Sequence, residues 1–197
     1  NPRGAHFDMY RFPRFGKYPG LTQREVIELR APHLGVPKER MAELLDGEPF
    51  NVPLATRFAE NYMIALNSMG ICDREDTVRA YPASGMTEVF NTVTGLDMSQ
   101  EEFLEASERI WTLEKCFNVR EGWTRADDNA PRRTFKDPLV TTTGTYPPLT
   151  QEYVDNLLDS YYEAHDWDTQ TGIPTRRRME ELNLATVADD LQKEGKP

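Results

Sequence analysis

The sequence feature that most constrains this chain is a helical pattern that ends at a glycine directly before an apolar residue and a cysteine. From Pro53 onward, apolar side chains recur at spacings of three and four, which places them on one face of an α-helix. They are Leu54, Phe58, Tyr62, Ala65, Leu66 and Met69. Gly70 can adopt the left-handed conformation that closes such a helix, and Ile71 can then pack back on Leu66. The spacing therefore predicts a Schellman cap that presents Cys72 at a fixed point beyond a rigid helix.

Cys72 has two interpretations on the residue pattern alone. Most cysteines beside a helix end are small buried hydrophobic residues. A thiol presented beyond a rigid helix can also ligate a metal cluster or react, although tetrahedral sites and cubane clusters need several ligands. The only other cysteine is Cys116, and the chain contains no CxxC pair. We expect Cys116 to lie in the core, and the role of Cys72 depends on the rest of the chain.

The charge balance excludes several classes of partner. The 197 residues carry a formal net charge of −10, whereas a nucleic-acid surface needs a basic face and adhesion to anionic lipid needs basic clusters. No apolar run approaches the ~20 residues of a membrane span, and no leader of the signal-peptide kind opens the chain. Two distant cysteines do not form a disulfide framework, which fits a reducing compartment. We therefore expect a cytoplasmic protein with no nucleic-acid partner and no membrane span.

Capping and turn signals predict further helices and little strand. A Ser or Thr with a glutamate three residues later indicates a capping box, and Pro, Gly and Thr mark other helix ends. The predicted helices begin at or just after Thr22, Pro37, Pro53, Met86, Ser99, Thr150 and Thr175. Residues 134–149 are rich in Thr and Pro and indicate an extended connector, and we expect the polar tail after Ala185 to fray. The expected fold class is mainly α.

The clearest helix of the chain follows Ser99, which pairs with Glu102 as a capping box. Its predicted apolar stripe consists of Phe103, Ala106, Ile110, Leu113 and Phe117. Leu104 and Trp111 widen that stripe, so more than one neighbouring element must cover this helix.

The end of that helix and the loop that follows it, residues 123–133, mix arginines with carboxylates. Arginine–carboxylate forks hold long loops in place more often than they perform chemistry. We therefore expect Arg120, Glu121 and Asp128 to brace the C-terminal part of the chain rather than to react.

No self-contained catalytic motif is present in the sequence. The histidines, His6, His33 and His165, form no HExxH pair, and there is no GxSxG, Walker A or GxGxxG motif. If the chain belongs to an enzyme, the difficult chemistry lies with a cofactor or with segments outside this chain.

Four stretches, taken in order, resemble one known family. They are NPRGAH at 1–6, NSMGIC at 67–72, FNVREG at 117–122 with Arg125, Asp127-Asp128 and PRR at 131–133, and YY, WD, GIPT and LNL between 161 and 184. In this order they resemble the tungsten-containing aldehyde ferredoxin oxidoreductase family, and they cover only its C-terminal third. The resemblance implies an irregular multi-helix assembly like domains 2 and 3 of that family. Residues 1–98 would form part of the second helical domain, which includes the cluster cysteine, and residues 99–197 the third.

The resemblance also implies site residues. The family motif Asp-x-x-Gly-Leu/Ile-Cys carries the fourth ligand of a [4Fe–4S] cluster, which would here be Cys72, while backbone groups of Gly70 and Ile71 would face a pterin. Asn67 stands where the family has aspartate, so it keeps hydrogen-bonding capacity but brings no charge. His6 would be a channel or proton-transfer group. The other three cluster cysteines would lie upstream of Asn1, as would an N-terminal β-rich, pterin-binding segment that this chain lacks.

The implied activity is oxidation of an aldehyde to a carboxylic acid at a tungsten bis-molybdopterin centre. Electrons would leave through the [4Fe–4S] cluster to ferredoxin or an electron-transfer subunit, and the enzyme could form a homo-oligomer. Because the chain begins at Asn1 in a turn-rich stretch, we expect a piece of a longer polypeptide that is incomplete and inactive by itself. Two alternatives stay open, namely part of the catalytic subunit of a tungsten-dependent benzoyl-CoA reductase and a metal-free helical interaction module.

Overall fold

The computed structural model describes residues 20–72, 80–142 and 144–196, and it confirms a mainly helical chain. The motif at residues 1–6, with His6, lies outside the described residues, so its role stays a prediction. The α-helices are α1 (Gln23–Arg30), α2 (Met41–Leu44), α3 (Val52–Ser68), α5 (Ala83–Thr94), α6 (Gln100–Arg120), α7 (Gln151–His165), α8 (Arg176–Glu181) and α9 (Ala185–Lys193). The 3₁₀ helices are η2 (Ala31–Leu34), η3 (Lys38–Arg40), η4 (Arg125–Asp128) and η5 (Arg132–Phe135), and the strands are β1 (Leu139–Thr141) and β2 (Gly144–Tyr146).

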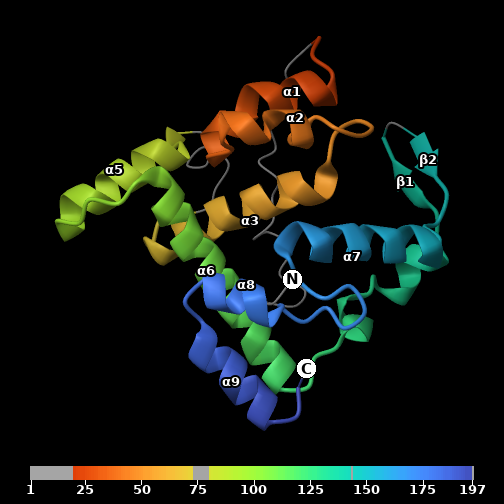
Figure 1. The fold of residues 1–197 in the computed structure, drawn as a ribbon. Helices are drawn as coiled ribbons and strands as arrows, with labels where there is room; N and C mark the ends of the chain where they lie inside the picture. The colour runs from red at the N-terminus through yellow and green to blue at the C-terminus, as the bar shows by residue number, and fades with distance from the viewer. Residues whose placement is uncertain (1–19, 73–79, 143, 197) are drawn as a thin grey trace.

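Helix α6 runs obliquely through the molecule, from α5 at its start toward α8 and α9 (Figure 1). Helix α3 packs against α6 and α7, α5 packs on the start of α6, and α9 packs on α6 and α8. The largest apolar cluster lies among α1, η2, α2, α3, α5 and the first turn of α6. A second cluster joins the end of α6 to α8 and α9, and a third, aromatic cluster joins α3, α6 and α7. The expected domain division between residues 98 and 99 stays a prediction.

The predicted helix starts are confirmed where local capping determines them. The side chains of Thr22 and Ser99 accept hydrogen bonds from the third residues of α1 and α6, and the glutamates at those positions bond back to the caps. Thr150 and Thr175 likewise cap α7 and α8. Helix α5 begins at Ala83, three residues before the predicted Met86, because both side chains are buried and the preceding proline is compatible with a helix start.

The prediction that the apolar stripe of α6 is buried is wrong for most of its residues. Only Phe103 is buried, while Ile110, Leu113 and Phe117 are 37%, 44% and 55% exposed. The buried face contains Leu104, Ser107, Glu108, Trp111, Thr112, Lys115, Cys116 and Val119. Charged partners on other elements neutralise Glu108 and Lys115, so a polar face can be buried at this position.

The C-terminal tail was expected to fray, but it forms α9. Leu184, Ala188 and Leu191 are buried at helical spacing against Met179 and the end of α6. The expected connector at 134–149 contains an exposed antiparallel hairpin in which Leu139 faces Tyr146. Among the described residues, no helix is both long enough and apolar enough to cross a membrane.

Candidate functional site

The end of α3 has the predicted Schellman geometry. Gly70 adopts a φ of +69°, and its N–H donates to the carbonyl of Asn67 at 3.0 Å. The N–H of Ile71 donates to the carbonyl of Leu66 at 3.0 Å, and the Ile71 side chain packs on the cluster that contains Leu66. These two hydrogen bonds and the apolar contact define the motif. The direction in which the chain leaves α3, and hence the position of Cys72, is therefore fixed by local structure.

The described residues leave the surface next to this cap open. Cys72 is exposed, and no heavy atom of the described residues, the chain neighbours excepted, lies within 4 Å of the position that a Cβ on Gly70 would take. The Asn67 side chain is half-buried, and its Nδ2 donates back to the Met63 carbonyl at 2.8 Å. A group placed against the end of α3 can therefore reach both the thiol and the backbone of the cap.

The described residues at this end of α3 can supply one ligand to a cluster that is shared with another segment, but they cannot form a complete metal site by themselves. Within the described residues, no group of three or more His, Cys, Asp or Glu side chains is arranged to hold a metal ion. Cys116 is buried 3.6 Å from the Met179 sulfur, and burial raises the pKa of its thiol to about 12, which confirms it as a core residue. Cys72 is thus the one thiol of the chain that a cluster from another segment could reach.

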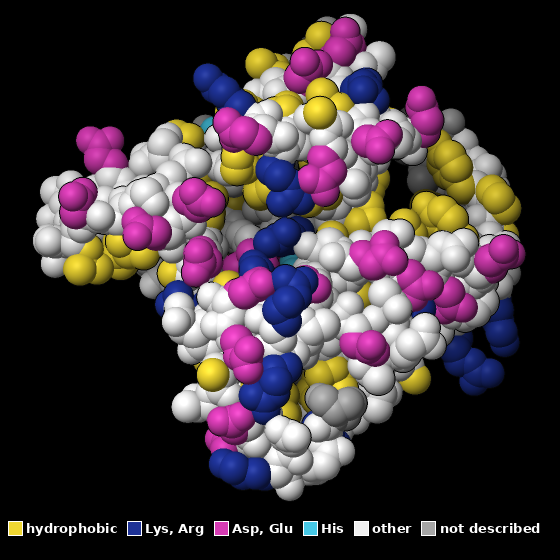
Figure 2. All heavy atoms as spheres, viewed as in Figure 1, with side chains coloured by type: hydrophobic (Ala, Val, Ile, Leu, Met, Phe, Trp, Pro, Cys, Tyr) yellow, Lys and Arg dark blue, Asp and Glu magenta, His cyan; other side chains and the backbone are white. Residues whose placement is uncertain are grey.

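The sequence reasoning missed a buried carboxylate at the crossing of α3 and α6. Arg57 donates to both Glu108 oxygens at 3.0 and 2.8 Å, and Arg178 donates to Glu108 at 2.6 Å. Burial alone would raise the pKa of the Glu108 carboxyl, but the two guanidiniums outweigh burial and hold that pKa below its ordinary value. These residues line a hollow of about 620 Å³ that Figure 2 shows in the middle of the face, with charges of both signs around it.

A second buried carboxylate, Glu60, joins α3 to α7. His165 Nε2 lies 3.0 Å from Glu60 Oε2, and the Tyr161 hydroxyl donates to both Glu60 oxygens at 3.2 Å. The Trp111 indole in turn donates to the Tyr161 hydroxyl at 3.2 Å. The His165 ring packs against the rings of Tyr161 and Trp167. This network ties the middle of α3 to the end of α7 inside an aromatic cluster.

The expected bracing role of Asp128 is confirmed. Its carboxylate accepts hydrogen bonds from Lys115 at 2.5 Å, from the Tyr162 hydroxyl at 2.6 Å and from the Trp123 indole at 2.9 Å. Burial opposes ionisation, but Lys115 and the hydrogen bonds keep the pKa of Asp128 below its ordinary value. Arg120 and Glu121 form an exposed pair with each other, and the Arg120 guanidinium also lies over the Phe117 ring.

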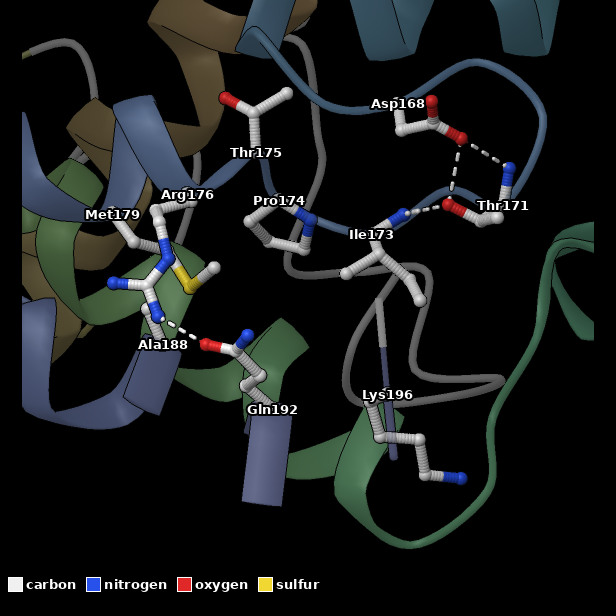
Figure 3. A pocket seen from close by; sticks show the side chains of 10 residues that line it. All are labelled: Asp168, Thr171, Ile173, Pro174, Thr175, Arg176, Met179, Ala188, Gln192 and Lys196. Atoms are coloured by element: carbon white, nitrogen blue, oxygen red, sulfur yellow. Dashed lines mark hydrogen bonds between the residues drawn. The ribbon is translucent and has the colours of Figure 1, made fainter. Parts of the chain in front are cut away.

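A further hollow, of about 490 Å³, lies between the loop before α8 and helix α9 (Figure 3). Its floor is apolar and includes Ile173 and Met179. Most of its polar wall groups are engaged within the chain, because Asp168 accepts from the backbone and hydroxyl of Thr171 and Arg176 donates to Gln192. The hollow therefore results from the packing of the loop against α9. It is distant in sequence from the cap of α3, and Ile173 and Met179 of its floor belong to the second apolar cluster rather than to the first.

Comparison with known proteins gives a consistent result. The sequence matches the family described as "Aldehyde ferredoxin oxidoreductase, domains 2 & 3" over residues 7–184. The tungsten-containing aldehyde ferredoxin oxidoreductase of Pyrococcus furiosus is 30% identical over 121 residues, which cover 61% of this chain and 19% of that protein. The protein of the same name from Thermococcus kodakarensis is 30% identical over 104 residues, covering 52% and 16%. The chain therefore spans less than a fifth of the length of these relatives.

One solved structure has a similar fold. It is described as "Active site complex BamBC of Benzoyl Coenzyme A reductase in complex with 1,5 Dienoyl-CoA" and matches with a TM-score of 0.66 over 91% of this chain and 29% of that chain. At 22% sequence identity the likeness concerns the fold alone. Together with the family match, it confirms the expected irregular multi-helix assembly of the domain 2 and 3 type.

Proposed function

Because the chain belongs to the aldehyde ferredoxin oxidoreductase family, we propose that it is the C-terminal portion of a tungsten-pterin, [4Fe–4S] oxidoreductase. The longer enzyme oxidises aldehydes to carboxylic acids with ferredoxin or an electron-transfer subunit as acceptor, in a reducing cytoplasm. In this reaction an aldehyde and a water give a carboxylic acid, two protons and two electrons. The chain alone is incomplete and inactive. Residues 1–98 belong to the second helical domain and residues 99–197 to the third.

The observation that carries this proposal is the presentation of Cys72. A thiol held by a rigid helix cap on an exposed surface, with no group of three or more candidate metal ligands among the described residues, suits one corner of a cluster shared between segments. When bound, the tungsten bis-molybdopterin centre supplies the two-electron oxidation and the [4Fe–4S] cluster passes the electrons on. The Cys72 sulfur would hold one iron of that cluster, and the cap of α3 fixes the position of Cys72 at the end of the helix.

The neighbouring residues have supporting roles in the proposal. The N–H groups of Gly70 and Ile71 are used in the cap, so it is their backbone carbonyls that would accept hydrogen bonds from the pterin. Asn67 offers an amide where the family has a carboxylate, so this chain holds its pterin without a negative charge at that position. His6 moves a proton near the substrate channel. The missing ligands come from the N-terminal pterin-binding segment of the longer polypeptide.

The test uses the longer polypeptide purified without oxygen. We expect iron, tungsten and an aldehyde-dependent reduction of ferredoxin that the 197-residue chain alone does not show. A protein that contains both metals but reduces an aromatic CoA thioester, and does not oxidise aldehydes, would favour the second candidate, a benzoyl-CoA reductase subunit. The fold of the BamBC structure motivates that candidate. A longer polypeptide without iron or tungsten would refute both and leave a helical interaction module.

A further inference from the structure

The outer face of α6 carries apolar side chains that are exposed, in addition to the buried apolar residues of its inner face. Ile110, Leu113 and Phe117 recur at spacings of three and four and form one stripe, here called the α6 stripe, about 10 Å long. All three are exposed, and the Arg120 guanidinium lies 4.6 Å from the centre of the Phe117 ring. Single exposed apolar residues need no explanation, but a continuous stripe on one helix does.

The opposite face of α6 explains why this stripe cannot turn inward. Glu108 is held by Arg57 and Arg178, and Lys115 is held by Asp128, all through buried contacts. Rotating α6 to bury the stripe would break these pairs and leave buried charges without partners, which is strongly unfavourable. The orientation of α6 is therefore fixed, and the part of the chain that the structure describes leaves the stripe exposed. A helix with one face in a core and an apolar stripe on the other is typical of a helix enclosed on both sides.

We propose that the α6 stripe is covered by the polypeptide that precedes this segment in the longer enzyme. The chain spans 19% of the Pyrococcus furiosus relative and 29% of the structural neighbour, so most of such an enzyme lies outside this chain. A segment of the same polypeptide is present at high effective concentration, so a short apolar stripe suffices to seat it. This inference rests on the proposed function only in requiring a longer polypeptide.

The experiment compares the accessibility of the stripe in two proteins. Leu113→Cys is introduced into the 197-residue chain and into the longer polypeptide purified as the holoenzyme, and each is labelled with N-ethylmaleimide. Peptide-resolved mass spectrometry keeps label at Cys72 separate. We expect Leu113→Cys to react at least about tenfold more slowly in the longer protein. Val140→Cys on the exposed strand β1 is the matched control and should react at the same rate in both.

Three results would overturn the inference. Equal labelling of Leu113→Cys in both proteins would show that nothing covers the stripe, and equal protection of Leu113→Cys and Val140→Cys would show that the stripe is not singled out. Protection that disappears on dilution, in either protein, would assign the cover to a second copy and also overturn it. Hydroxyl-radical labelling of Phe117 in the unsubstituted proteins gives the same comparison if Leu113→Cys does not fold. The iron content of the longer protein tests the proposed function separately, because protection of the stripe does not require a cluster.

Discussion

Replacement of Glu108 by Gln is the sharpest test of how α6 is held. Glu108 is 4% exposed and neutralises Arg57 and Arg178, whose side chains are 19% and 16% exposed. Removing one partner of a buried ion pair costs about 3–5 kcal/mol. Arg178 keeps a second carboxylate, Glu181, at 2.8 Å, and both guanidiniums retain some water, so the lower end of that range, about 3 kcal/mol, is expected.

Urea unfolding followed by far-UV circular dichroism measures this loss. With an m value of about 2 kcal/mol/M, the midpoint should fall by about 1.5 M in Glu108→Gln. Glu105→Gln is the matched control, because Glu105 lies on the same helix, is exposed and has only a 3.9 Å contact with Arg109. Its stability should stay within about 0.5 kcal/mol of the unsubstituted chain. A Glu108→Gln midpoint equal to that of the control would refute the claim that paired charges fix the inner face of α6.

Three further outcomes follow from the structure. Gly70→Ala should lower stability by about 1 kcal/mol in thermal unfolding, because φ is +69° there, whereas Gly85→Ala inside α5 should be neutral or stabilising. The pKa values of Glu108 and Asp128 are lowered in the folded chain, so their stabilisation is complete above their unfolded pKa values and is lost as the pH falls. The free energy of unfolding, measured from pH 6 to pH 3, should thus decrease once the pH falls below about 4. It should decrease less steeply with pH in Asp128→Asn, and a slope equal to that of the unsubstituted chain would contradict this. Leu191→Ala should cost about 3 kcal/mol, and a cost near zero would mean that α9 does not pack.

Local signals account for what could be predicted. The capping boxes of Thr22 and Ser99 involve residues three apart, and the Schellman cap at Gly70 involves residues within about one helical turn. Both partners of each hydrogen bond therefore lie in one short stretch of sequence, where a pattern can reveal them. The same locality explains why the position of Cys72 beyond α3 could be anticipated.

Long-range pairing accounts for what could not be predicted. The burial of Glu108 depends on Arg57, 51 residues earlier, and on Arg178, 70 residues later. Hydrophobic periodicity does not detect such distant partners, so it predicts the wrong face of α6 as the buried one. The Glu60–His165 contact spans 105 residues and has no local signature. A charged residue at the centre of an apolar helical pattern was the available signal, because such a residue is buried only when it is paired. For the tail, the spacing of Leu184, Ala188 and Leu191 was present, but polar composition outweighed it.

The most direct test of the central claim is the cluster content of the longer polypeptide carrying Cys72→Ser. The account predicts that this variant loses the broad visible absorbance and the reduced-state electron paramagnetic resonance signal of a [4Fe–4S] cluster. Cys116→Ala, which changes the buried cysteine of the chain, should retain both. A Cys72→Ser protein with its full complement of iron and an unchanged cluster spectrum would contradict the claim that the cap of α3 presents a cluster ligand.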